Sequence, residues 1–257
     1  NRQDLTVELG DGQTVYDINY LSVYCFAVGV NFGHVPVNLT PQRNPVPPSI
    51  PPVRDGPPPP ALQAWTRPQV AIIPDGDKPT DLTFALGPPA GAKARAMRSI
   101  CDNLSTVWYV QGQMTPEIWV QRGKIYRLKA QGGEQHPLYI TSEETGGYIN
   151  KPASEQAVIK NFAGGKGKNV GSKCEFKPIG DRRASDSDSF ETFDEFRHFL
   201  EEDCAQPRQP GQLTWTPDAS TPNTVYYGSF TTFNMGGPIR VCNSIGGSPQ
   251  DPKCINN

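Results

Sequence analysis

The chain has 257 residues and a formal net charge of −2 at pH 7, enough for one large or two small domains with a proper core. A balance this close to neutrality gives no indication of nucleic acid or an anionic membrane as a partner. No apolar run approaches the roughly 18 residues that a membrane-spanning helix needs. Because there is neither an initiator methionine nor an apolar leader, we expect a mature form or a fragment.

Six cysteines are scattered along the chain without a C-x-x-C pair: Cys25, Cys101, Cys174, Cys204, Cys242 and Cys254. An even number with this spacing favours disulfides in an oxidising compartment. The alternative is six free buried thiols in a cytosolic protein. Two N-x-S/T sequons, at Asn38 and Asn103, fit a secreted glycoprotein, although such triplets also arise by chance. We therefore expect a secreted, extracellular chain.

Residues 1–38 are β-rich, with strands expected at 5–9, 15–20 and 21–30 and a turn at Asp11-Gly12. About 38 residues are too few for an independent core, so we interpret this piece as the C-terminal part of a small, truncated β domain. Residues 39–64 are crowded with prolines. Such a segment adopts extended polyproline II and acts as a semi-rigid linker.

Residues 65–257 read as a larger β domain. Strands separated by Gly and Pro turn signals indicate a sandwich or barrel; they are expected at 81–86, 106–110, 117–120, 124–129 and 137–141. The β pattern is interrupted at 150–210, where 160–177 is basic and Gly-rich. This stretch lacks the spacing of a phosphate loop, so we interpret it as a solvated loop.

The insertion at 150–210 contains the one clear helix signal. Asp188 can cap the helix, and Glu191 can reach back to the cap. A stripe of apolar side chains at helical spacing predicts a face packed on the sandwich; its members are Phe190, Phe193, Phe196, Phe199 and Leu200.

Position along the chain predicts one cysteine pairing and leaves the others open. Cys174 and Cys204 bracket the helical part of the insertion, and we predict that they form a disulfide that staples this long loop. In the Gly/Pro/Asn-rich tail, Cys242 and Cys254 could pair with each other. Pairing of Cys101 with either of them is equally open, since six cysteines allow 15 connectivities.

The segment 225–241 consists of a β-rich run, a short loop, a Met-Gly-Gly turn and a last strand. Together with other stretches of the chain it carries a family resemblance. Residues 16–35 (YDINYLSVYCFAVGVNFGHV) resemble the end of the small β domain that precedes the DOMON module in Skeletor and Knickkopf proteins. Residues 108–133, 136–148 and 215–237 resemble the C-terminal cupredoxin-like domain of the same proteins.

This resemblance implies an all-β fold, a Greek-key cupredoxin-like β-sandwich with one helical insertion. It also implies a copper site at the end of the sandwich. A blue-copper centre needs a thiolate, two imidazoles and a weak axial methionine. His136 and Met235 stand at two of these positions, but Ser229 and Thr232 stand where the thiolate and second imidazole are expected. We therefore expect a degenerate copper site and no cofactor, with copper the one candidate. Cys25 corresponds to a cysteine that has been suggested to be redox active in the family; the alternative is a buried or disulfide-bonded cysteine.

The sequence contains no nucleophile elbow and only three histidines, so we do not expect an enzyme. By resemblance, the first hypothesis is a non-catalytic structural or binding module of a matrix- or cuticle-associated protein, with matrix polysaccharide or protein as partner. A redox protein that uses copper or Cys25 is the alternative, and a plain adhesion module is a third. Aromatic side chains that could stack on sugar rings, although most suit a core, are Trp65, Trp108, Trp119, Trp215, Tyr148, Tyr226 and Tyr227.

Overall fold

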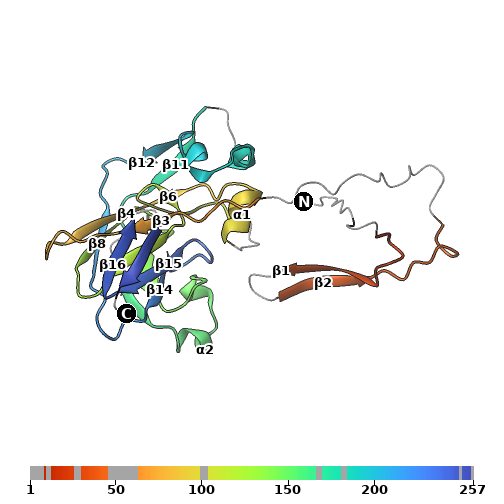
Figure 1. Ribbon diagram of the computed structural model, residues 1–257, viewed down its shortest axis with the longest axis horizontal. Helices are drawn as coiled ribbons and strands as arrows, with labels where there is room; N and C mark the ends of the chain where they lie inside the picture. The colour runs from red at the N-terminus through yellow and green to blue at the C-terminus, as the bar shows by residue number, and fades with distance from the viewer. Residues whose placement is uncertain are drawn as a thin grey trace. The chain divides into compact units, whose positions relative to one another are not determined.

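The computed structural model describes residues 9, 13–25, 30–45, 63–98, 104–165, 170–180, 184–248 and 251–255. The chain divides into two compact units (Figure 1), which are described separately below. Unit 1 comprises Asn1–Gln63 and Ser99–Cys101, and unit 2 comprises Ala64–Arg98 and Asp102–Asn257.

Unit 1 contains an antiparallel hairpin of β1 (Tyr20–Cys25) and β2 (Val30–Pro36). The strand expected at 15–20 is wrong for most of its length. There the Asp17 carboxylate accepts hydrogen bonds from the backbone N–H and the hydroxyl of Thr14, at 2.7 and 2.8 Å, and this local turn delays the strand to Tyr20. The expected strand at 5–9, apart from Leu9, and the Asp11-Gly12 turn lie outside the described residues.

Unit 2 is built on two sheets, so the predicted all-β sandwich is confirmed. The first sheet has the strand order β10 (Asn161–Gly164), β9 (Leu138–Thr141), β14 (Thr224–Ser229), β15 (Gly237–Cys242), β7 (Glu117–Gln121), β3 (Gln69–Ala71). The second has the order β12 (Leu200–Cys204), β11 (Cys174–Pro178), β4 (Thr80–Gly87), β5 (Val107–Val110), β6 (Gln113–Met114), with β8 (Tyr126–Ala130) between β4 and β13 (Gly211–Trp215). A separate hairpin, β16 (Ser244–Ser248) and β17 (Asp251–Ile255), ends the described chain.

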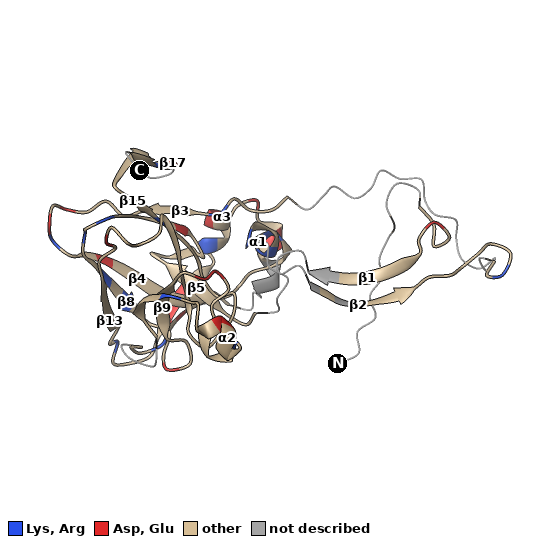
Figure 2. Ribbon diagram, turned by 90° about the horizontal axis from the view of Figure 1, so that it is seen from below, with Lys and Arg blue, Asp and Glu red and all other residues tan. Residues whose placement is uncertain are grey.

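Short helices lie in the connections: α1 (Ala92–Arg98), η1 (Tyr148–Asn150), α2 (Ala153–Gln156), η2 (Ala184–Ser189) and α3 (Phe193–Arg197). The expected solvated loop at 160–177 is wrong in part, because β10 and the start of β11 fall within it. Residues 166–169 of this stretch are outside the described part. Lys and Arg residues and Asp and Glu residues are interspersed over unit 2 in Figure 2, in keeping with the small net charge.

The main core fills the space between the two sheets. Alternate residues of the strands point into it, and its largest members include Phe84, Trp108, Tyr126 and Tyr227. The Phe84 ring stands edge-on to both Trp108 and Tyr227, with centroid distances of 6.1 and 5.6 Å. Such edge-to-face pairs add to the stabilisation from burial.

A second core covers the other face of the second sheet. Tyr109, which follows Trp108 in β5 and therefore points the opposite way, packs with Phe176, Phe193 and Phe196 there. The apolar stripe of the insertion thus packs on the sandwich as predicted through Phe190, Phe193, Phe196 and Leu200, whereas Phe199 is half-buried and lies outside this core.

The helix of the insertion is shorter than expected, and its predicted cap is wrong. Helix α3 spans Phe193–Arg197, and Thr192 with Glu195 forms its capping box. Asp188 instead caps α1, a helix that the sequence interpretation missed: its two carboxylate oxygens accept the backbone N–H groups of Ala92 and Lys93 at 2.8 and 2.9 Å. Thr192 and Glu195 have the same capping-box spacing as Asp188 and Glu191 but lie four residues later. The helix therefore begins four residues later than expected and is shorter.

Two disulfides are present among the described residues. The predicted Cys174–Cys204 disulfide is confirmed, and the two cysteines face each other across the antiparallel pair β11–β12. Cys242 and Cys254 are also bonded. This second bond decides the open alternative, because neither of these sulfurs remains for Cys101, which itself lies outside the described residues.

Candidate functional site

The residues at the expected copper positions lie near one end of the first sheet, where β9 and β14 are antiparallel neighbours. Ser229, the last residue of β14, stands opposite Leu138, the first residue of β9. Beyond this pair, the backbone N–H of Phe230 donates to the carbonyl of Pro137 at 2.8 Å. The ladder therefore brings His136 close to the loop that follows β14.

Ser229 is completely buried. Its Oγ accepts the backbone N–H groups of Thr231 and Thr232, at 3.3 and 3.2 Å, and lies 3.0 Å from the Thr231 hydroxyl. A serine hydroxyl that accepts N–H groups two and three residues ahead forms an ST-type turn. Without it, two main-chain donors at the rim of the core would lose their acceptor.

The two threonines extend these bonds to the other loop. The Thr231 hydroxyl donates to the carbonyl of Gln135 at 2.5 Å, so the proton shared between the hydroxyls of Ser229 and Thr231 comes from Ser229. The Thr232 hydroxyl is hydrogen-bonded to Nδ1 of His136 at 3.2 Å. We call the set Ser229, Thr231, Thr232 and His136 the hydroxyl corner. Within this corner the Ser229 hydroxyl donates its single proton and accepts two backbone N–H groups.

Met235 belongs to the main core, with 1% of its surface exposed. Its carbonyl accepts the backbone N–H of Trp108 at 2.8 Å, which ties the loop to the second sheet. The turn after it requires glycine, because a Cβ on Gly236 would collide with the carbonyl of Tyr227. Packing and main-chain bonds therefore fix Met235 independently of any ligand.

The imidazole of His136 is half-buried. This burial lowers its pKa below the ordinary value, and the nearby Lys173 cation lowers it further, while Glu175 acts in the opposite direction. Burial disfavours the charged ring because it removes water from around it. The neutral ring, which can bond through Nδ1 to a hydroxyl as donor or acceptor, is therefore the form that the fold favours.

The donor set at the hydroxyl corner does not fit a blue-copper centre. Such a centre requires a thiolate and two imidazoles, whereas the corner offers one imidazole and three hydroxyls. A serine hydroxyl is a hard, high-pKa donor, and Ser229 already spends its proton and lone pairs on protein groups. The one imidazole, His136, also has its Nδ1 engaged.

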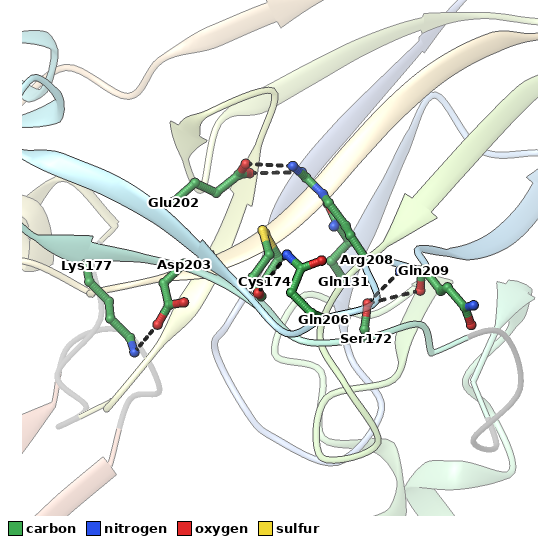
Figure 3. Close-up of a disulfide and its surroundings, with 10 residues drawn as sticks. Gln131, Ser172, Cys174, Lys177, Glu202, Asp203, Gln206, Arg208 and Gln209 are labelled. Carbon is green, nitrogen blue, oxygen red and sulfur yellow. Dashed lines mark hydrogen bonds and ion pairs between the residues drawn. A yellow bond between two sulfur atoms is a disulfide. The ribbon is translucent and has the colours of Figure 1, made fainter.

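Within the described ranges, one group of three potential metal ligands comes together elsewhere, at Cys174, Glu202 and Cys204. The two sulfurs are bonded to each other, so they are not thiolates. Figure 3 shows this disulfide beside the Glu202 carboxylate, which is paired with Arg208 through both oxygens, at 3.0 and 3.2 Å. In the folded, oxidised chain this group is a covalent staple with an ion pair beside it.

The remaining candidate residues are placed as follows. Cys25 ends β1, but its side chain is outside the described residues, and Asn103 is outside them entirely. Asn38 is exposed, as a glycan acceptor must be. Of the seven candidate sugar-stacking residues, four are buried in the two cores and unavailable for stacking, namely Trp65, Trp108, Trp215 and Tyr227, whereas Trp119, Tyr148 and Tyr226 are half-buried.

Thr231 and the carbonyl of Gln135 complete the corner, and the sequence interpretation missed both. A usable signal was present, because Ser229 is followed by threonines at the second and third positions, the pattern of a hydroxyl turn. The comparison with copper ligands pointed to Thr232 but not to the neighbouring Thr231.

The geometry defines unit 2 as an all-β sandwich module with a disulfide-stapled insertion and a hydroxyl-lined corner. No family model matches the chain. It is similar to two forms of one protein of Drosophila melanogaster, "Protein Skeletor, isoforms B/C" and "Protein Skeletor, isoforms D/E". Each is 30% identical to it over 220 residues, which is 79% of this chain.

The chain is therefore related to the Skeletor proteins at the level of the family, as the sequence motifs predicted. It spans 26% of the length of the B/C form and 14% of the D/E form. In the part of the chain that the structure describes, no helix is long and apolar enough to cross a membrane.

The lowered pKa of His136 predicts a dependence of stability on pH. The unfolded chain binds a proton to this ring at a higher pH than the folded chain, so the free energy of unfolding falls as pH drops through about 6.5 toward the folded pKa. His136→Gln removes this contribution. In denaturant titrations between about pH 5 and 7, the variant shows a flatter dependence than the wild type. Equal slopes for His136→Gln and the wild type would contradict the prediction.

Proposed function

We propose that this chain is a non-catalytic structural or binding module of an extracellular, matrix- or cuticle-associated protein, and that its degenerate copper site serves as a loop clamp. The observation that carries the proposal is the bonding of Ser229. Where a copper centre needs a thiolate, a buried hydroxyl accepts two N–H groups and donates its one proton to Thr231. A hydroxyl committed in this way holds the loop and cannot serve as the thiolate ligand of an electron-transfer centre.

The extracellular location is supported by the two disulfides, since such bonds persist in oxidising compartments and are rare in the cytosol. The exposed Asn38 sequon is in keeping with it. The association with matrix is inferred from the relationship to Skeletor and from the motifs shared with Skeletor and Knickkopf proteins.

Copper binding separates this proposal from the redox alternative. The full chain is mixed with one equivalent of Cu(II), passed through a desalting column, and examined for bound copper and for visible absorption. We expect no stoichiometric copper and no intense thiolate charge-transfer band. The double variant Ser229→Cys/Thr232→His restores the two absent ligand types beside His136 and should gain both signals. Adding His136→Gln to it should abolish them. A stable, strongly coloured centre in the wild type would refute the proposal.

Matrix association is tested by cosedimentation of the full chain with insoluble polysaccharide, with chitin and cellulose as neutral probes, hyaluronan-coated beads as an acidic probe, and a collagen film for protein. We expect retention on at least one of them that survives a metal chelator, because no step of the proposed binding uses a metal. Failure to bind any of these four probes, or release by the chelator, would contradict the proposal.

A further inference from the structure

An open hollow of about 400 Å³ lies on the outer side of the second sheet, away from the hydroxyl corner. Strand β4, the turn after β5, helix α3 and the pair β11–β12 all contribute to it, through Thr83, Gln111, Gly112, Phe176, Arg197 and Glu202. Four of these six residues carry charged or polar side chains. The arrangement suits a polar ligand that can form several hydrogen bonds at once.

Arg197 is held rigidly at this hollow. Its Nε donates to the carbonyl of Gly112 and its Nη1 to the carbonyl of Leu200, each at 3.0 Å. The guanidinium lies over the ring of Phe176, 4.1 Å from its centroid. Among the residues that the structure describes, no carboxylate forms an ion pair with Arg197. It therefore presents a pre-positioned cation with Nη2 free to donate, the geometry that recognises carboxylates and sulfates.

Glu202 supplies hydrogen-bond acceptors to the hollow, whereas Arg197 supplies donors. It stands directly across the ladder from Phe176, and Arg208 binds both of its carboxylate oxygens (Figure 3). The charge of Glu202 is thus neutralised, so it does not cancel that of Arg197. The carboxylate keeps lone pairs that can accept protons from a ligand, and its side chain is 31% exposed.

Thr83 and Gln111 complete the polar lining. Gln111 has a left-handed backbone with a φ of 51°, and its side-chain oxygen accepts the backbone N–H of Thr83 at 3.0 Å. This bond fixes the direction of the amide. In the described part of the chain its nitrogen has no acceptor, so it remains a donor beside Arg197.

We propose that this hollow binds an acidic sugar residue of a matrix glycan, with Arg197 on the carboxylate or sulfate ester and Glu202, Gln111 and Thr83 on the hydroxyl groups. The proposal rests on the proposed function and names the class of polymer that the module binds. An acidic peptide would need several cations in a row, whereas the lining of the hollow holds one cation, Arg197. A sugar ring that carries both an acid and hydroxyls needs the mixture that is present.

The test is titration calorimetry of the full chain with four soluble probes. They are a hyaluronan hexasaccharide for the carboxylate, a chondroitin sulfate hexasaccharide for the sulfate ester, chitohexaose as a neutral sugar, and hexaglutamate as an acidic peptide. We expect binding of one or both acidic oligosaccharides, and the difference between them identifies the anion. Arg197→Gln weakens this binding at least tenfold, and higher salt weakens it further.

Arg240→Gln is the matched control. Arg240 is an exposed arginine of the first sheet, already paired with Glu117, and its loss should leave the affinity unchanged. Because Arg197 also holds main-chain carbonyls, Gln111→Glu provides a second variant with less structural risk. It keeps an oxygen that can accept the N–H of Thr83 but removes the amide donor, and it should weaken binding several-fold.

Equal affinity of the wild type and both hollow variants would overturn the proposal, as would equal binding of chitohexaose, preferential binding of hexaglutamate, or no binding of either acidic sugar. If the chain is nevertheless retained on an insoluble matrix polymer, the proposed function stands and only the assignment of this hollow fails.

Discussion

The second sheet of unit 2 is buried on both faces along strand β5 and the adjoining end of β4, and the rest of the structure depends on this constraint. In strand β5 every residue is buried: Trp108 faces the main core, and its neighbour Tyr109 faces the second core. A strand of this kind cannot be exposed to water on either side without losing a large apolar area. The insertion must therefore pack on the outer face of the sheet.

Packing of the insertion in turn produces the features on that face. The aromatic residues of α3 pack beside Phe176, and this places Arg197 over the Phe176 ring at the polar hollow. The same packing sets β12 against β11, with the Cys174–Cys204 disulfide as a covalent tie between them. At the end of the first sheet the hydroxyl corner performs a comparable task with hydrogen bonds, because it joins the loop before β9 to the loop after β14.

The features that local pattern decides could be predicted from the sequence. Alternating residues marked the strands, and the cysteines that bracket the insertion marked its disulfide. The match to a copper-site pattern brought His136 and Thr232 together, and they are in fact hydrogen-bonded at 3.2 Å. The pattern correctly indicated the place, although it said nothing about the bonds that hydroxyls form there.

Other features depend on contacts between distant parts of the chain. Asp188 was expected to cap the helix next to it, but it caps α1, whose first N–H groups lie 96 and 95 residues away in the sequence. The run of Ala, Lys, Arg and Met in α1 favours a helix locally, but this cap cannot be inferred locally. The hollow at Arg197 is equally non-local, since Arg197 and Gly112 are 85 residues apart. Propensity and residue spacing report on neighbours along the chain, so they do not predict contacts between residues this far apart in the sequence.

The central claim is that Ser229 has a structural role at a position where a metal ligand would be expected. Amide hydrogen exchange at Thr231 and Thr232, compared between the wild type and Ser229→Ala, tests it most directly. Loss of one hydrogen bond is worth about 1 kcal/mol, so we predict that both amides exchange on the order of five- to tenfold faster in the variant, while the Val241 amide, bonded to the carbonyl of Asn223, is unaffected. Unchanged protection of Thr231 and Thr232 would contradict the account, because the serine would then not be holding the loop.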